Sequence, residues 1–263
     1  MEWGVEMDRV IQFEKVSFIY PSSRFGLKNL AFEVQRGEIF VVTGTNGAGK
    51  TTLLRLIVGL LTPYEGEIRV LDMNVTKKAL PQIRAKVGFV FQNPDEQLFA
   101  PTIYEDVAFG PRNLGWPEEQ VDEAVKKWLE IVGLQNYGDY SPYELSFGQK
   151  KRAALAGVFA MNPEILLLDE PFANLDLPAT IALIRLIDSI VADKNVTVVF
   201  SSHDCALVEN WSDHMLVLNG GRSIFFGDSR IGFQKEVIKR ILGDPEELKK
   251  VSRKPRPSLL EFT

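Results

Sequence analysis

The chain has 263 residues, of which 45% are hydrophobic, and its formal net charge at pH 7 is -5. This length can bury the core of one large domain that carries an inserted or appended subdomain. The acidic balance argues against a nucleic-acid-binding protein, because such proteins usually carry a surplus of Lys and Arg to neutralise phosphates. The single cysteine, Cys205, excludes an internal disulfide and indicates a reducing compartment.

The apolar runs of the sequence are far shorter than the roughly 18 residues that read as a membrane span. Residues 1–8 have no basic region followed by an apolar run, so no secretion signal is expected there. Any membrane role would therefore come through partner proteins.

Two kinds of short apolar run predict strands. Residues 16–20 and 30–34 partly alternate apolar with polar side chains, as antiparallel strands with one wet face do. The later runs are β-branched and are each followed by a loop and a helical pattern, which is typical of a parallel sheet with crossover helices. These later runs occupy residues 39–42, 87–91, 165–168 and 196–200. An antiparallel lobe is therefore expected to precede a parallel α/β core.

Helical periodicity replaces the strand rhythm between residues 94 and 163. Val121, Val125 and Leu129 recur four apart there, which places them on one face of a helix. We interpret this region as a helical subdomain inserted into the core.

Two later helices are also marked in the sequence. Pro178 opens one at a position where proline is tolerated, and Asp204 is suited to cap another. An amphipathic stretch at 233–242 follows, and then a tail rich in Lys, Arg and Pro. The predicted division is a main domain over residues 8–232 and a C-terminal segment over residues 233–263.

The segment GTNGAGKT, residues 44–51, matches the phosphate-loop pattern G-x-x-x-x-G-K-[ST] between a predicted strand and a predicted helix. Its glycines permit backbone conformations and close approaches that let amide N–H groups point at phosphate oxygens. Lys50 adds positive charge for the β- and γ-phosphates, and the Thr51 hydroxyl is placed to hold Mg²⁺. The alternative is a glycine-rich turn with an accidental lysine. We predict that the chain binds and hydrolyses ATP.

An acidic pair, Asp169 and Glu170, follows the predicted strand at 165–168. Mg²⁺ bound to a nucleotide usually contacts an acidic residue at the end of a neighbouring strand. We predict that Asp169 reaches the metal directly or through water, and that Glu170 orients and polarises the attacking water. The alternative is that both are solvated strand-end residues.

Residues 145–149, LSFGQ, run into a predicted helix and resemble the signature sequence of ATP-binding cassette (ABC) ATPases. In that family, the signature closes over the nucleotide held by the opposite subunit, so that two copies sandwich two nucleotides. By resemblance, Ser146 and Gly148 would contact a partner's γ-phosphate. Phe147 stands where a glycine is usual, which is a departure from the commonest pattern.

The other landmarks of ABC ATPases occur in order. Gln92 resembles the glutamine that senses Mg²⁺ and couples to the membrane partner, and Asp176 matches the aspartate loop of the dimer interface. His203 resembles the switch histidine that contacts the γ-phosphate, its alternative being a structural role. Tyr20 stands where the family places an aromatic residue that stacks on adenine, unless it is an ordinary strand aromatic.

The resemblance covers residues 10–226 and implies the ABC ATPase fold. This is a P-loop NTPase α/β fold with an N-terminal antiparallel β lobe, a parallel-sheet core and an inserted helical subdomain. The implied catalytic residues are Lys50, Glu170 and His203. The implied Mg²⁺ ligands are Thr51, Gln92 and Asp169. The implied nucleotide-binding residues are Tyr20, Gly44, Thr45, Asn46, Gly47, Ala48, Gly49, Lys50, Thr51, Thr52, Gln92, Ser146, Gly148, Gln149 and Asp176.

Two departures from the family pattern lie near the aspartate loop. Phe172 replaces a small hydroxylated residue, and Leu177-Pro178 replaces the commoner start after Asp176. Neither removes a residue that would bind phosphate, metal or water.

The segments at 91–115 and 145–152 resemble the ATPases of energy-coupling-factor importers and their cobalt and nickel relatives. Those machines pair two identical or related ATPases with a transmembrane coupling protein and a substrate-binding membrane subunit that captures vitamins or metal ions. The resemblance implies an ATPase subunit at the cytoplasmic face of the cell membrane, without a nucleic-acid partner. Four apolar residues in a loop region near Gln92 are expected to form a groove for a partner helix, unless they only pack the helical insertion. These residues are Leu98, Phe99, Val107 and Phe109.

Two other functions would share part of these motifs. A non-transport ABC ATPase acting on ribosomes or nucleic acid would use the same motifs, but such proteins usually carry two cassettes or a long coiled-coil insertion. A P-loop kinase would leave LSFGQ and His203 unexplained. The stretch at 233–242 either holds a second copy or docks on its own domain. The basic tail is interpreted as solvated, the alternative being that it lies on an anionic membrane surface.

Overall fold

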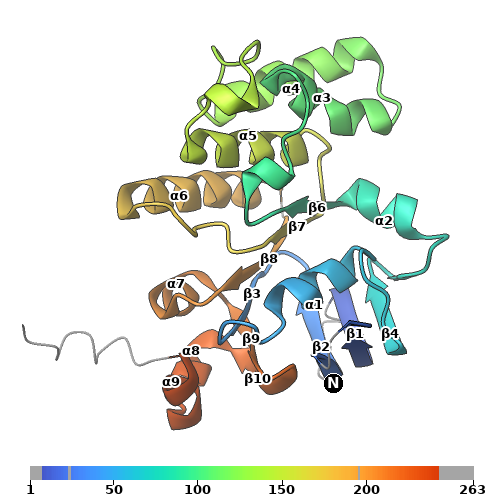
Figure 1. The fold of residues 1–263 in the computed structure, drawn as a ribbon, viewed down its shortest axis with the longest axis vertical. Coiled ribbons are helices and arrows are strands. Elements are labelled where there is room, and N and C mark those ends of the chain that lie inside the picture. The colour runs from blue at the N-terminus through green and yellow to red at the C-terminus, as the bar shows by residue number, and fades with distance from the viewer. Residues whose placement is uncertain (1–7, 23–24, 195, 243–263) are drawn as a thin grey trace, which may run out of the picture.

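The computed structural model describes residues 8–22, 25–194 and 196–242, which form two sheets and several layers of helices (Figure 1). The strands are β1 (Arg9–Ile19), β2 (Gly26–Gln35), β3 (Ile39–Gly44), β4 (Glu65–Val70), β5 (Met73–Asn74), β6 (Val87–Val90), β7 (Ile165–Leu168), β8 (Thr197–Ser202), β9 (His214–Asn219) and β10 (Arg222–Asp228). The α-helices are α1 (Lys50–Ile57), α2 (Leu80–Lys86), α3 (Ile103–Asn113), α4 (Glu118–Ile131), α5 (Phe147–Phe159), α6 (Leu177–Lys194), α7 (Cys205–Trp211), α8 (Ser229–Phe233) and α9 (Glu236–Leu242). Two 3-10 turns are η1 (Pro94–Glu96) and η2 (Pro142–Glu144).

The larger sheet has the strand order β10-β9-β3-β8-β7-β6, and all of its neighbouring pairs are parallel except β10 with β9. Every residue of β7 is buried, as expected for a strand covered on both faces. Leu168 pairs with Phe200, and Thr43 pairs with Ser202. The residues that follow β3, β7 and β8 therefore meet at one edge of the sheet, where ligands of open α/β sheets bind.

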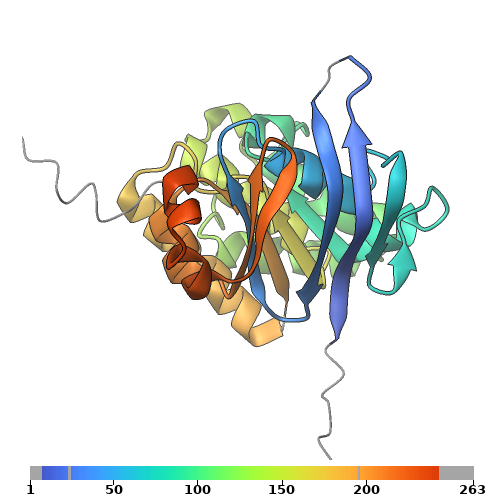
Figure 2. The same cartoon turned by 90° about the horizontal axis from the view of Figure 1, so that it is seen from below.

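The smaller sheet is antiparallel and has the order β2-β1-β4-β5. Figure 2 shows β1 and β2 as long paired strands beside the larger sheet. A single cluster of buried apolar side chains joins both sheets to α1, and it includes Phe13, Leu27, Phe40, Leu53 and Leu54. The predicted fold class, with an antiparallel lobe before a parallel core, is confirmed.

The region between residues 94 and 163 contains α3, α4 and α5, which lie together at one end of the molecule (Figure 1). Val121, Val125 and Leu129 are buried on one face of α4, as the periodicity predicts. Trp128 stacks on Phe159 of α5 with ring centroids 5.0 Å apart. The helical character expected of this region is present, and within the described residues no helix is long and apolar enough to cross a membrane.

Three local expectations are wrong. Tyr20 does not end a strand, because β1 stops at Ile19. Val107 and Phe109 lie on helix α3 and not in a loop, and Val107 is fully buried against the core. It is therefore unable to line a groove for another protein, whereas Phe99 and Phe109 are exposed and contact each other edge to face.

The C-terminal stretch at 233–242 is not one amphipathic element. It is divided between α8 and α9, and Phe233 and Ile238 are buried in the core of the same chain. Val237 points outward with 53% of its surface exposed. Docking on its own domain thus accounts for the buried residues of this stretch, and the basic tail lies outside the described residues.

Candidate functional site

Residues 46–52 of the phosphate loop line a cleft at the edge of the larger sheet. The loop connects β3 to α1, whose first residue is Lys50. The Lys50 ammonium is buried and donates hydrogen bonds back to the carbonyl oxygens of Gly44, at 3.2 Å, and Thr45, at 3.4 Å. These contacts hold a positive charge at the N-terminus of α1, and both the charge and the helix N-terminus favour binding of a phosphate.

The three glycines of the loop are required for different reasons. Gly47 has a φ of +75° and open space around it, so only its backbone conformation matters. Gly49 has a φ of +110°, and a Cβ there would lie 2.5 Å from a Leu27 methyl group. A Cβ on Gly44, whose φ is +141°, would lie 2.1 Å from the carbonyl oxygen of Leu218 in β9. Gly44 is therefore crowded by the neighbouring strand, a constraint that the sequence pattern alone does not reveal.

Asp169 lies directly beyond β7 and is almost fully buried. Its Oδ1 accepts hydrogen bonds from the Thr51 hydroxyl at 3.0 Å and the Ser201 hydroxyl at 2.7 Å. Burial raises the pKa of the Asp169 carboxyl, and these two hydrogen bonds act in the opposite direction. The structure therefore brings the two predicted oxygen ligands Thr51 and Asp169 together.

Glu170 lines the same cleft, and its carboxylate lies between two nitrogen-bearing side chains. One carboxylate oxygen lies 3.4 Å from the Lys50 ammonium, and the other lies 3.3 Å from Nδ1 of His203. The backbone N–H of Glu170 donates to the Ser201 hydroxyl at 2.8 Å. Its φ is +42°, in the left-handed region that a residue with a Cβ rarely adopts. Glu170 is thus held in an unusual conformation by its surroundings.

Gln92 and Tyr20 are placed beside the phosphate loop. Gln92 follows β6 and lines the same cleft. The Tyr20 hydroxyl lies 3.2 Å from the Thr52 hydroxyl, and its ring lies 6.5 Å from the Phe25 ring at an interplanar angle of 24°. The structure therefore places residues 46–52, Gln92, Glu170 and His203 around one cleft, whereas Tyr20, Gly44, Thr45 and Asp169 do not line it.

The signature residues lie elsewhere. Ser146 caps α5, and its hydroxyl accepts from the Gln149 N–H while the Gln149 side chain accepts from the Ser146 N–H. Ser146, Gly148 and Gln149 line a separate cleft beside α6. Asp176 caps α6 by accepting from the Ala179 N–H at 2.8 Å. None of these four predicted residues lines the cleft of its own phosphate loop.

Sequence reasoning missed Ser201 and Lys151. Ser201 joins Asp169 to Glu170, and the signal for it is the position of the hydroxyl at the end of the strand beside β7. Lys151 is buried and donates to the carbonyl oxygens of Glu170 and Pro171. In the sequence, Lys151 is marked only as the second lysine after LSFGQ. A lysine pair of this kind is expected to be exposed to solvent, and only the packing of α5 shows that Lys151 is buried.

Comparisons with known proteins identify the family of the chain. The family model described as ABC transporter matches residues 27–173. The energy-coupling factor transporter ATP-binding protein EcfA of Methanothermobacter thermautotrophicus is 44% identical over 221 residues, which cover 83% of this chain and 70% of that protein. An EcfA of Methanocaldococcus jannaschii is 40% identical over 250 residues, which cover 94% of this chain and 86% of that protein.

A solved structure supports the same family assignment, that of an ABC transporter. CbiO1 from Clostridium perfringens, described as part of the ABC transporter complex CbiONQ, superposes with a TM-score of 0.79 at 33% identity. The superposition covers 89% of this chain and 94% of CbiO1. The chain therefore belongs to the ABC transporter family, as an ATP-hydrolysing subunit.

Proposed function

We propose that ATP hydrolysis by this chain powers an importer of the energy-coupling-factor type, in which Glu170 activates the attacking water. The observation that carries the proposal is the position of the Glu170 carboxylate between Lys50 and His203, in the cleft that the phosphate loop lines. The EcfA relatives, which are energy-coupling factor transporter subunits by name, supply the type of transporter.

Each residue of the cleft has a task that its position supports. Lys50 and the loop amides bind and orient the phosphates, and Glu170 accepts a hydrogen bond from the water that attacks the γ-phosphate. His203, reached by the other Glu170 oxygen, holds the carboxylate in place and donates toward the phosphate. Tyr20, beside Thr52, supports the adenine ring.

The donor set fits Mg²⁺. The Thr51 hydroxyl and the Asp169 carboxylate lie 3.0 Å apart at the loop, and the Gln92 amide lines the same cleft. Magnesium prefers such hard oxygen ligands and is bound through one or two carboxylates together with phosphates. When bound, it would neutralise charge that develops on the phosphates.

A second ATPase subunit, identical or related, is part of the proposal. Ser146 caps α5 and Gly148 lies in the first turn of that helix, and both line a cleft other than that of the phosphate loop of the same chain. The N-terminus of a helix suits a phosphate group, and a nucleotide bound by the second subunit would supply that group. Asp176, at the start of α6, would lie at that interface.

The proposed contact with membrane subunits is a groove beside η1 and α3. Phe99 and Phe109 line it with 67% and 46% of their surfaces exposed, and the groove is walled by α2 and α5. Asp106 accepts from the Phe99 and Ala100 N–H groups and thereby fixes the loop that carries Phe99. An amphipathic helix of a transmembrane coupling protein fits such a surface. The chain would then act at the cytoplasmic face of the membrane, in uptake of a vitamin or a transition-metal ion bound by another membrane subunit.

The test of the proposal is Glu170→Gln in the full chain, purified from membranes with its bound partners. We expect ATP to remain bound while kcat falls by about 100-fold or more, because the amide is a poor base. Glu130→Gln, an exposed change on α4, is the matched control. Near-normal hydrolysis by Glu170→Gln would refute the assigned role, and purification without any membrane subunit would refute the importer.

A further inference from the structure

Lys151 is a buried lysine on the helix that follows the signature residues. It lies in the second turn of α5 with only 3% of its surface exposed, whereas its neighbour Lys150 pairs with the exposed Asp95 at 2.6 Å. Within the described part of the chain, the Lys151 ammonium forms no salt bridge with a carboxylate, and burial lowers the pKa of Lys151 to about 8. A buried charge of this kind is costly, so an apolar side chain would serve better if the position only needed packing.

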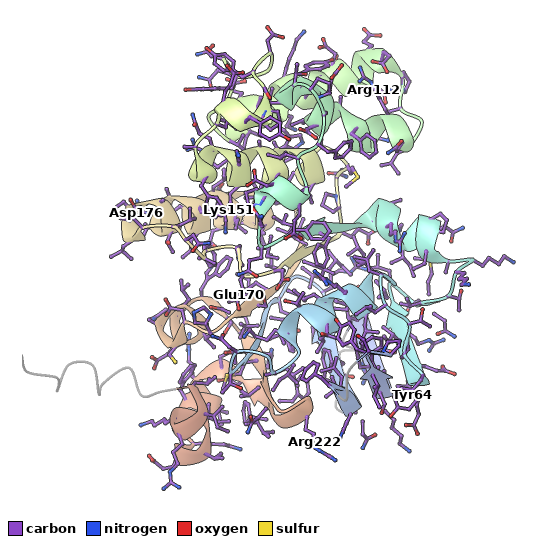
Figure 3. The ribbon with its side chains drawn as sticks, in the orientation of Figure 1. Tyr64, Arg112, Lys151, Glu170, Asp176 and Arg222 are labelled. Atoms are coloured by element: carbon purple, nitrogen blue, oxygen red, sulfur yellow. The ribbon has the colours of Figure 1, made fainter. Side chains whose placement is uncertain are left out.

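The ammonium contacts the segment that follows β7. It donates hydrogen bonds to the carbonyl oxygen of Pro171 and, at 3.4 Å, to that of Glu170. The Phe147 ring, one turn earlier on α5, lies with its centroid 5.3 Å from the ammonium. Lys151 thus joins the signature helix to the backbone of Glu170 (Figure 3).

The backbone of Glu170 forms hydrogen bonds through both its N–H and its carbonyl oxygen. Its N–H donates to the buried Ser201 hydroxyl at 2.8 Å, and its carbonyl oxygen accepts from Lys151. The φ of +42° at Glu170 is disfavoured and persists only where the surroundings impose it. This conformation directs the carboxylate toward Lys50 and His203. Loss of either hydrogen bond, the one to Ser201 or the one from Lys151, would let the carboxylate leave that position.

We propose that Lys151 is a positioning residue that fixes the Glu170 backbone from the signature helix and transmits movement of that helix to the carboxylate. The inference rests on the proposed role of Glu170 in hydrolysis. Ser146 and Gly148 stand at the start of the same helix. Contact of the signature with a nucleotide on the other copy therefore adjusts Glu170 in this chain's own cleft, so that the two sites of a dimer are coupled.

The experiment compares variants of the full chain in the complex purified from membranes. Lys151→Met keeps the length and apolar stem of the side chain but removes the donors, and Lys151→Gln is shorter but keeps an N–H donor. Lys126→Met, an exposed lysine paired with Asp122 on α4, is the control for loss of one charge. The measurements are kcat, KM for ATP, ATP binding and the thermal midpoint.

We expect Lys151→Met to lower kcat by about 10- to 100-fold, the size of effect that a small misplacement of a catalytic group produces. ATP binding, KM and the thermal midpoint should stay near the parent values, because the phosphate loop is untouched. Lys151→Gln should lie between Lys151→Met and the parent. In a Glu170→Gln background, Lys151→Met should cause no further loss in single-turnover hydrolysis, since both changes disable the same group.

Three outcomes would overturn the proposal. They are a kcat of Lys151→Met equal to that of Lys126→Met, an additive loss in the double variant, and unfolding of Lys151→Met combined with a parent-like kcat in Lys151→Gln. The last result would show a role in stability alone. If Glu170→Gln itself hydrolyses ATP, the proposed role of Glu170 fails whatever Lys151 does. If Glu170→Gln is inactive and Lys151→Met is normal, only the present inference fails.

Discussion

Replacement of Ser201 by alanine tests the hydrogen-bond network beneath the catalytic cleft. Ser201 is completely buried at the end of β8. Its hydroxyl donates to Asp169 Oδ1 at 2.7 Å and accepts the Glu170 N–H at 2.8 Å. Alanine leaves that N–H without its partner, while Oδ1 of Asp169 keeps the hydrogen bond from Thr51. The Ser201→Ala variant is therefore expected to lose both stability and activity.

The size of the effect follows from the two bonds. A hydrogen bond to a charged group contributes about 1.5–3 kcal/mol, and a buried donor left unsatisfied costs about 1–3 kcal/mol. Because Asp169 retains one donor, the sum should fall near the lower end, at about 2.5–4 kcal/mol of unfolding free energy. Loosening of the Glu170 backbone should lower kcat by about tenfold or more, with a smaller change in KM for ATP.

Urea unfolding of the full chain measures the first effect, and steady-state ATP hydrolysis measures the second. The control is Ser189→Ala, because the Ser189 hydroxyl donates to the Leu186 carbonyl on an exposed face of α6. A loss below about 0.5 kcal/mol, within the range of neutral surface substitutions, would refute the reasoning. So would an unchanged kcat in a variant that is measurably destabilised.

Two further predictions concern the loop and the groove. Gly44→Ala should prevent correct pairing of β3 with β9, because its Cβ would lie 2.1 Å from the Leu218 carbonyl, and a thermal midpoint equal to the parent would contradict this. Phe99→Asp should detach the chain from its membrane subunits in a co-purification assay while leaving its intrinsic ATP binding unchanged. Tyr64→Asp, an exposed aromatic residue on the far side of α1, is its control (Figure 3), and retention of the membrane subunits by Phe99→Asp would rule out the groove.

Local patterns predicted much of the fold because their causes are local. Period-two and period-3.6 apolar spacing identified strands and helix α4, since side-chain direction follows directly from backbone geometry. The strands β4, β5, β9 and β10 escaped prediction. Val107 was misassigned to a loop because a short apolar run does not distinguish a buried helix from a loop packed against a core.

The residues of the candidate site also fall into those that local sequence patterns predicted and those that only the structure revealed. The phosphate loop, Asp169, Glu170 and His203 were predicted because each stands next to a recognisable strand or helix boundary. Ser201 and Lys151 were missed because their partners are distant in the sequence. The partners of Ser201 lie 31 and 32 residues away along the chain, and those of Lys151 lie 19 and 20 residues away. Only packing brings these groups together.

The sequence by itself predicted that residues 44–51 bind ATP phosphates, because that recognition needs only a contiguous loop at the start of a helix. The tertiary structure alone decided which groups surround Glu170. Parallel pairing of β7 with β8 put Ser201 beside it, and the packing of α5 put Lys151 against its carbonyl oxygen. The physical reason is that catalytic geometry depends on distances between separate elements, which are set by how the elements pack and not by the residues of any one of them.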